Sequence, residues 1–182
     1  MRNQPNWQRR RRSLLVLILG LLFLGLLIQP SYQWTKTNVA AMAGRHDSQM
    51  SPIIMIPGSS ATQNRFDTLV KPLNKADHRR HRLIKMTVMT DDKIKMTGSL
   101  RARDNEPIIV VGFQNKRDGY DNIKHQARWF SLAFKKLAAK YQFNNFKAIG
   151  HSNGGLIYTY YFEHYFNRDD IKVKRIMTIG SP

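Results

Sequence analysis

The sequence contains no cysteine among its 182 residues. This absence excludes disulfides, cysteine-ligated zinc and a thiol nucleophile, although it does not fix the cellular compartment. Acidic residues are also scarce, with 12 Asp and Glu against 30 Lys and Arg, which gives a net charge of +18. The imbalance excludes an acidic solvating tail and predicts an anionic neighbour: a membrane, a nucleic acid or a polymer of the cell envelope.

Several motifs that bind metals, nucleotides or nucleic acids are missing as well. The sequence has no His-x-x-x-His pair, no acidic loop of calcium-binding spacing and no glycine-rich phosphate loop, so we expect no metal and no cofactor. Basic residues are scattered without interleaved aromatic residues, and no nucleic-acid-binding module is recognisable, so we expect no nucleic acid partner. The densest basic group comprises Arg79, Arg80, Arg82 and Lys85, beside His78 and His81.

The positive charge at the N-terminus stands next to a long apolar segment. Arg2 and the run of arginines at 9–12 precede residues 13–28, which carry no charge and are mostly Leu, Ile and Val. Positive charge followed by an apolar segment is typical of membrane insertion or export. We therefore expect residues 1–12 to stay on the cytoplasmic side and residues 13–35 to form a transmembrane anchor or a signal segment.

Two outcomes for this segment remain open. The small-x-small pattern at 41–43 is typical of a cleavage site, which would release the rest of the chain near Ala43 as a secreted protein. Cleavage there would give a signal of 43 residues, longer than the usual ~15–30. This length favours an uncleaved anchor with an outward-facing domain. Residues 36–51 are expected to be a linker without regular structure. Six basic and no acidic residues lie in residues 1–43, so residues 44–182 keep a net charge of +12.

Strand and helix patterns alternate along residues 52–182. Short apolar runs bounded by Pro and Gly predict buried strands, and apolar residues spaced by three or four over 120–141 predict an amphipathic helix. Alternating strands and helices favour an α/β fold with a mostly parallel sheet flanked by helices, to which a local β-hairpin is added. The predicted strands are 52–58, 83–88, 94–97, 107–113, 146–149 and 173–179, and the predicted helices are 64–73, 120–141 and 155–166.

The pattern G-x-S-x-G occurs at residues 150–154, between a predicted strand and a predicted helix. This context is typical of a nucleophile elbow, a sharp turn that exposes a serine hydroxyl above the sheet. Ser152 is the candidate nucleophile. Gly150 and Gly154 would allow the tight turn, and His151 is expected to pack under it rather than to act as the base.

Acyl transfer by a serine needs hydrogen-bond donors for the oxyanion of the tetrahedral intermediate. The backbone N–H of Asn153, at the start of the following helix, is one candidate donor. The second donor in this type of site comes from the loop after an earlier strand, where the chain has Pro57 and Gly58. The backbone N–H of Ser59 or of Ser60 is therefore the second candidate.

Three segments together resemble a known family: 150–155, 54–60 and 177–182. They resemble an uncharacterised family of Gram-positive cell-surface alpha/beta hydrolases, related to lipases and esterases. The resemblance covers residues 50–182 and implies a serine hydrolase that acts on an ester or other acyl bond without a cofactor. It also implies a triad in the chain order Ser, then Asp or Glu, then His.

The residues after Ser152 do not fit that triad. The acids there are Glu163, Asp169 and Asp170, and the only histidine is His164. Glu163 and His164 fall in the predicted helix that follows the elbow, whereas triad partners come from loops after later strands. We therefore expect residues 52–182 to be the N-terminal part of an alpha/beta-hydrolase domain, truncated at its C-terminus and inactive alone.

A second function from another class is a non-catalytic protein that binds the cell envelope through a degenerate hydrolase fold. The net charge of +12 on residues 44–182 and the missing triad partners favour it. It would bind anionic envelope polymers in a salt-dependent manner. The sequence therefore predicts an acyl substrate as a partner, together with the membrane through residues 13–35. The second function adds anionic polymers of the cell envelope.

Overall fold

The computed structural model describes residues 6–76, 81–101 and 104–182. The chain divides into two compact units, Met1–Arg45 and His46–Pro182. The basic group named above lies partly outside the described residues, because residues 77–80 are not described.

The described residues of the first unit form one long helix, α1 (Asn6–Arg45), with Pro30 inside it. Its segment Arg10–Thr37 is long and apolar enough to cross a membrane, a test that an N-terminal signal sequence also passes. At ~1.5 Å per residue, these 28 residues reach about 42 Å, more than the ~30 Å of a hydrocarbon core. The apolar stretch is therefore long enough to serve as an anchor.

The prediction of an irregular linker from residue 36 is wrong for its first ten residues, because α1 continues to Arg45. These residues include Ala40, Ala41 and Ala43, and alanine is the best helix former. Extending an existing helix also avoids the cost of nucleating a new one. Only residues 46–51 keep the irregular structure that was expected of the linker.

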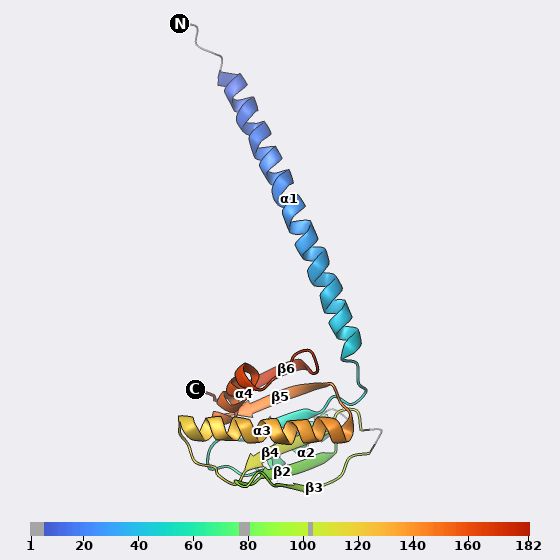
Figure 1. Cartoon of the computed structure of the whole chain (residues 1–182), viewed down its shortest axis with the longest axis vertical. Helices are drawn as coiled ribbons and strands as arrows, with labels where there is room; N and C mark the ends of the chain where they lie inside the picture. The colour runs from blue at the N-terminus through green and yellow to red at the C-terminus, as the bar shows by residue number, and fades with distance from the viewer. Residues whose placement is uncertain (1–5, 77–80, 102–103) are drawn as a thin grey trace. The chain divides into compact units, whose positions relative to one another are not determined.

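The second unit is built on a six-stranded sheet in the order β3-β2-β4-β1-β5-β6 (Figure 1). All neighbouring strands run parallel except β2 and β3, which form the predicted antiparallel hairpin. The sheet thus confirms the α/β fold with a mostly parallel sheet and a local β-hairpin that was expected from the sequence. The strands are β1 (Ile53–Ile56), β2 (Leu83–Val88), β3 (Ile94–Thr97), β4 (Ile108–Phe113), β5 (Asn145–His151) and β6 (Lys172–Ile179).

In the described part of this unit, three helices flank the sheet: α2 (Asp67–Ala76), α3 (Tyr120–Tyr141) and α4 (Asn153–His164). In Figure 1, α3 lies across the front of the sheet. The helix α2 begins and ends three residues later than the predicted 64–73, and it continues through Pro72 without the expected interruption. The helix α4 begins at the residue after Ser152, two residues earlier than predicted, which brings its N-terminus to the candidate nucleophile.

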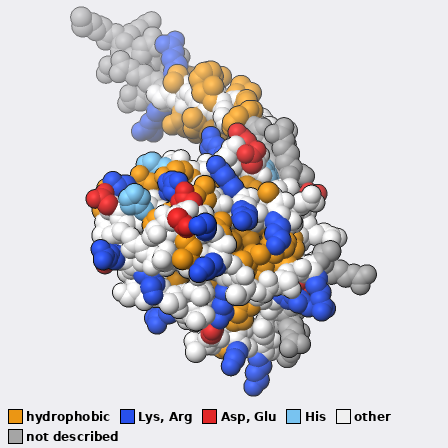
Figure 2. All heavy atoms as spheres, turned by 60° about the horizontal axis from the view of Figure 1, so that its bottom comes forward, with side chains coloured by type: hydrophobic (Ala, Val, Ile, Leu, Met, Phe, Trp, Pro, Cys, Tyr) orange, Lys and Arg blue, Asp and Glu red, His pale blue; other side chains and the backbone are white. Residues whose placement is uncertain are grey.

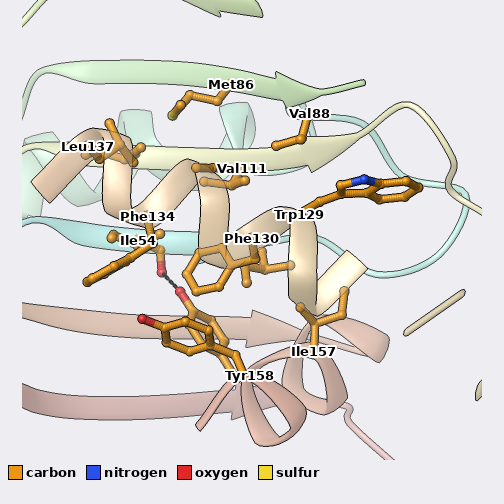
Figure 3. Packing of buried hydrophobic residues seen from close by; sticks show 14 of the residues in the cluster. Ile54, Met86, Val88, Val111, Trp129, Phe130, Phe134, Leu137, Ile157 and Tyr158 are labelled. Atoms are coloured by element: carbon orange, nitrogen blue, oxygen red, sulfur yellow. Dashed lines mark hydrogen bonds between the residues drawn. The ribbon is translucent and has the colours of Figure 1, made fainter. Parts of the chain in front are cut away.

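The core has two layers because successive strand residues point to opposite faces of the sheet. On β1, Ile54 and Ile56 join the large cluster with α3 and α4, whereas Met55 joins the smaller cluster with Val70 of α2. In the large cluster, Phe130 of α3 makes edge-to-face contacts with aromatic rings of α4 (Figure 3). The two layers hold β1 between β4 and β5, and both β1 and β5 end at the candidate site.

The chain enters this unit through residues 46–51, which are anchored at the amino end of β5. The buried amide of Asn145 donates to the carbonyl oxygens of His46 at 3.0 Å and of Ser48 at 3.2 Å. His46 is itself buried, with its Nε2 3.0 Å from the carbonyl oxygen of Asp169. The entry point thus lies at the end of β5 opposite to Ser152.

Lys and Arg side chains are spread over the surface seen in Figure 2 and do not gather in one patch on that face. This distribution agrees with the scattered basic residues of the sequence. On this face the excess positive charge is therefore distributed over the surface and is not concentrated in one patch.

Candidate active site

Ser152 occupies the turn between β5 and α4 with backbone angles of φ 51° and ψ −128°. A positive φ is uncommon for a residue with a side chain and stores strain unless the surroundings hold it. The N–H of Ser152 donates to the carbonyl of Ile179 at 2.8 Å, and its carbonyl accepts from Gly155 N–H at 2.9 Å and Ser181 Oγ at 2.8 Å. Three hydrogen bonds therefore hold Ser152 in the strained conformation of an elbow.

The two elbow glycines lie where no side chain would fit. A Cβ on Gly154 would collide with the carbonyl oxygen of Ile56 at the end of β1. A Cβ on Gly150 would lie 2.6 Å from the backbone nitrogen of Gly155, closer than real Cβ contacts. The glycines thus let the first turn of α4 pack directly on β1 and β5.

The loop after β1 runs directly against Ser152. A Cβ on Gly58 would lie 2.7 Å from Cβ of Ser152 and 3.2 Å from its Oγ. The side chain of Asn153 then ties this loop to the elbow, because its Nδ2 donates to Ser59 Oγ at 2.5 Å. The same Nδ2 donates to Asp118 Oδ1 at 2.5 Å, in the loop between β4 and α3. Three strand ends thus meet around one amide group.

The two oxyanion candidates in the loop after β1 differ in their hydrogen bonds. The N–H of Ser60 already donates to the carbonyl of Lys116 at 2.9 Å, so it is engaged within the protein. Among the described residues, no backbone hydrogen bond starts from the N–H of Ser59. The N–H of Asn153 is the first of α4, and the first amides of a helix have no partner within it. Ser59 and Asn153 therefore remain as the pair of backbone donors beside Ser152.

Ser152 lines a surface depression of about 520 Å³, formed with residues 58–62, Asn64, Arg65 and His151. His151 is among the residues that line the depression, and it is half-buried. Its Nδ1 atom is buried and has no hydrogen-bond partner in the described part of the chain. A small acyl group could enter this depression and reach the Ser152 hydroxyl.

His164 and Asp170, which follow Ser152 in the chain, contact residues of their own helix and turn. His164 ends α4, where its Nδ1 lies 3.0 Å from the carbonyl oxygen of Tyr160 and its ring stacks on the Tyr160 ring at 3.9 Å. Asp170 accepts a hydrogen bond from Asn167 at 2.7 Å. These contacts place both residues in the helix and turn that lead away from the elbow, as expected from the sequence.

The remaining described histidines are also held elsewhere. His81 Nδ1 lies 2.6 Å from the carbonyl oxygen of Glu106, before the start of β4. His125 lies on α3 with its ring 6.0 Å from the Trp129 ring. His78 lies outside the described residues. Within the described residues, no group of three or more His, Cys, Asp or Glu side chains is arranged to hold a metal ion.

Sequence reasoning missed three residues of this site: Arg65, Asp118 and Ser181. Asp118 follows β4 and Ser181 follows β6, so each comes after the carboxyl end of a parallel strand, the edge where ligands bind in open α/β sheets. That rule could have indicated both loops. No sequence pattern pointed to Arg65, because it belongs to an irregular segment before α2.

Related proteins are found among the solved structures. One, described as the "putative cell surface hydrolase from Lactobacillus plantarum WCFS1", is 52% identical with a TM-score of 0.70. The similarity covers 75% of this chain and 55% of that one, so the present chain spans about half the length of that relative. The product of gene lin2722 from Listeria innocua is 31% identical with a TM-score of 0.66, over 73% of this chain and 52% of that one.

Two further comparisons concern sequence. No match is found among the curated proteins. Residues 42–182 match the model of a family described as "Alpha/beta hydrolase of unknown function (DUF915)". The match covers the whole sheet and the turn at Ser152. Since it spans most of the chain, this protein belongs to that family of alpha/beta hydrolases.

Proposed function

We propose that residues 46–182 carry the nucleophile and the oxyanion donors of a serine hydrolase that cleaves an ester or a similar acyl bond. The single observation that carries this proposal is the strained backbone of Ser152, held by three hydrogen bonds at the start of α4. Strain of this kind costs about 1–3 kcal/mol and persists where the surrounding structure enforces it, which is common at active sites. A serine in an ordinary turn would need no such enforcement.

In the proposed reaction, Ser152 Oγ attacks the carbonyl carbon of the substrate, and the carbonyl oxygen becomes an oxyanion. The N–H groups of Asn153 and Ser59 would stabilise this oxyanion, and removal of one such donor typically slows hydrolases about 10²–10³-fold. Ser152 needs a base to take its proton, because a serine hydroxyl is a weak nucleophile at neutral pH. The proposal assigns that base, and the acid that orients it, to no residue of this chain.

We further propose that α1 anchors the domain at the outer face of a cell membrane. The apolar segment Arg10–Thr37 supports this location, as does the description of the Lactobacillus relative as a cell surface protein. The arginines at 10–12 precede the apolar stretch, and positive charge flanking a membrane segment stays on the cytoplasmic side. The hydrolase domain would then face outward.

Labelling with a fluorophosphonate probe tests the assignment of the nucleophile. Since the proposal assigns no base to this chain, imidazole is added as an external base. We expect the chain then to be labelled, and Ser152→Ala to reduce that labelling by at least about tenfold, because the probe phosphonylates an activated serine. Ser99→Ala is the matched control, since Ser99 is an exposed serine in the loop after β3 and should label like the unchanged chain. Equal labelling of Ser152→Ala, or no labelling of the unchanged chain in the presence of imidazole, would contradict the proposal.

A non-catalytic protein that binds anionic envelope polymers is the second candidate. The net charge of +12 on residues 44–182 and its spread over the surface in Figure 2 favour it. It predicts binding to an anionic polymer such as polyglutamate that weakens strongly as salt is raised, together with no labelling of Ser152. Binding that is equal at low and high salt would count against this second function.

A further inference from the structure

The depression beside Ser152 is bordered by cations. Arg65 lines it together with Ser152 and His151. A second depression of about 610 Å³ lies next to it and is lined by Lys116, Arg117 and four polar residues. Ser60 lines both depressions, so the two hollows share a wall. Three cations therefore border two adjoining hollows, one of which contains the candidate nucleophile.

The loops that carry these cations are fixed to each other. Ser60 has a positive φ of 63°, and its N–H donates to the carbonyl of Lys116 at 2.9 Å. The side chain of Gln126, buried on α3, donates to the carbonyls of Asn115 at 2.9 Å and Arg117 at 3.3 Å. The backbone that carries Lys116 and Arg117 is thus held by hydrogen bonds from both sides. This order reduces the conformational entropy that the loop would lose when a ligand binds.

None of these three cations forms an ion pair with a carboxylate in the described part of the chain. Other cations near the sheet are paired, for example Lys85 with Asp67 at 2.6 Å and Arg128 with Asp92 at 2.6 Å. The cations beside the hollows therefore have no internal anion to neutralise them.

Asp118 is the acid closest to them in sequence, but its carboxylate is engaged elsewhere. Its Oδ1 accepts hydrogen bonds from Asn153 Nδ2 at 2.5 Å and from the N–H of Gly119 at 2.7 Å. That carboxylate holds the elbow and the start of α3 together. It lines neither of the two hollows.

We propose that the substrate of this site carries an anionic group, a carboxylate or a phosphate, which Arg65 binds beside Ser152 with Lys116 and Arg117 in support. The substrate assignment rests on the proposed hydrolase function, whereas the binding of the anion does not. A guanidinium can pair with either kind of anion through two parallel hydrogen bonds. A cleft lined by one sign of charge also raises the local concentration of ligands of opposite charge.

The test is a binding measurement that does not depend on the reactivity of Ser152. The full chain with Ser152→Ala, in detergent, is titrated with monomethyl succinate, glycerol 3-phosphate and the neutral ester methyl butyrate, and the amide NMR shifts of residues 58–60 are followed. We expect at least one anion to bind about fivefold or more tightly than the neutral ester, and its binding to weaken at high salt. A preference for one anion identifies the recognised group.

Variants of the cations then assign the binding. In the same background, Arg65→Gln should weaken binding of the anion about three- to tenfold, and Lys116→Gln or Arg117→Gln about two- to threefold, because these side chains are at least partly solvated. Arg65→Lys should retain part of the affinity. The control is Arg168→Gln, an exposed arginine in the turn before β6, which should bind the anion as the unchanged background does.

Equal affinity for the neutral and the anionic compounds, or an Arg65→Gln variant that binds the anion like the control, would overturn the inference. The two proposals fail independently. Anion binding without labelling of Ser152 would refute the hydrolase and leave the anion site. Labelling of Ser152 without anion binding would refute only the present inference.

Discussion

The strands β4 and β6 belong to the same sheet and are both predicted from apolar residues, yet they differ completely in exposure. All six residues of β4 are buried, because β2 and β1 flank it and helices cover both faces of the sheet there. Six of the eight residues of β6 are exposed, among them Ile176 and Met177, which are 53% and 56% exposed. Whether an apolar strand is buried thus depends on its neighbours. An apolar side chain on the edge strand β6 lacks the neighbouring atoms that cover such a side chain on β4.

The exposed strand nevertheless supports the candidate site. The carbonyl of Ile179 accepts the hydrogen bond from Ser152 N–H, and Ser181 donates to the Ser152 carbonyl. We therefore expect the covered strands to contribute most of the stability of the sheet, and β6 to contribute mainly through its hydrogen bonds with Ser152. Four substitutions test this division, and they are given in order of expected effect.

Ile109→Ala on β4 should have the largest effect. Ile109 is fully buried in the large core cluster, and truncation of a buried isoleucine leaves a cavity that costs about 2–5 kcal/mol. Urea unfolding of the full chain in detergent, followed by circular dichroism, measures the loss. A loss below about 1 kcal/mol would show that the centre of the sheet is less tightly packed than its burial indicates.

Gly154→Ala tests the contact between the covered strand β1 and the elbow. The new Cβ would collide with the carbonyl oxygen of Ile56, a backbone atom that cannot move aside as a flexible side chain can. Overpacking of this kind costs about 1–3 kcal/mol. The same urea experiment measures it. An unchanged unfolding midpoint would mean that α4 is not packed directly on β1.

Asp92→Asn tests how the other edge of the sheet is held. Asp92, in the turn between β2 and β3, accepts hydrogen bonds from Arg128 at 2.8 Å and 2.6 Å and from Trp129 Nε1 at 2.9 Å. The Arg128 guanidinium hydrogen-bonded to Asp92 lowers the pKa of that carboxyl below its ordinary value of 3.8. The stabilisation is therefore present above this value and is lost as the pH falls through the lowered pKa.

The Asp92→Asn variant should lower stability slightly at neutral pH, and less than either core variant, because the ion pair is exposed to solvent. The difference from the unchanged chain should shrink as the pH is lowered below the ordinary value. Arg128→Gln supplies the control, since its effect should not add to that of Asp92→Asn if the two side chains act as a pair. A difference that is constant with pH, or fully additive effects, would refute the role of this pair.

Ile176→Ala on β6 should have the smallest effect and is matched in chemistry to Ile109→Ala. Ile176 is already 53% exposed, so its truncation removes little buried area and should change stability by no more than about 0.5 kcal/mol. The ratio of the two isoleucine effects measures the contrast between β4 and β6 directly. Comparable losses would show that β6 is covered in solution.

Local patterns predicted much of this fold from the sequence. The hairpin strands and α3 begin and end at the predicted residues, because side-chain alternation and the stripe of apolar residues are local signals. The stripe from Ile123 to Leu137 is buried as predicted. The helix boundaries near Pro72 and residues 36–45 were predicted less well, because tertiary packing and helix propagation overrode weak local signals.

The candidate site, like the fold, could be predicted from the sequence only where its residues are close together in the chain. The motif at 150–154 pointed to Ser152 and to Asn153 from the sequence, because its residues are adjacent in the chain. The hydrogen bonds of Asn153 to Ser59 and to Asp118 join residues separated by 94 and 35 positions. The engagement of the Ser60 N–H by Lys116 likewise depends on the pairing of β1 with β4.

The sequence by itself thus determined the alternation of strands and helices, the apolar N-terminal segment, the excess of positive charge and the elbow motif, since each depends on neighbouring residues. The tertiary structure decided the strand order, the exposure of β6, the hydrogen bond that engages the Ser60 N–H and the place of Arg65 in the depression that Ser152 lines. The physical reason is that hydrogen bonds between strands and contacts between loops form at short range in space. Their partners are far apart in the chain, where no local pattern records them.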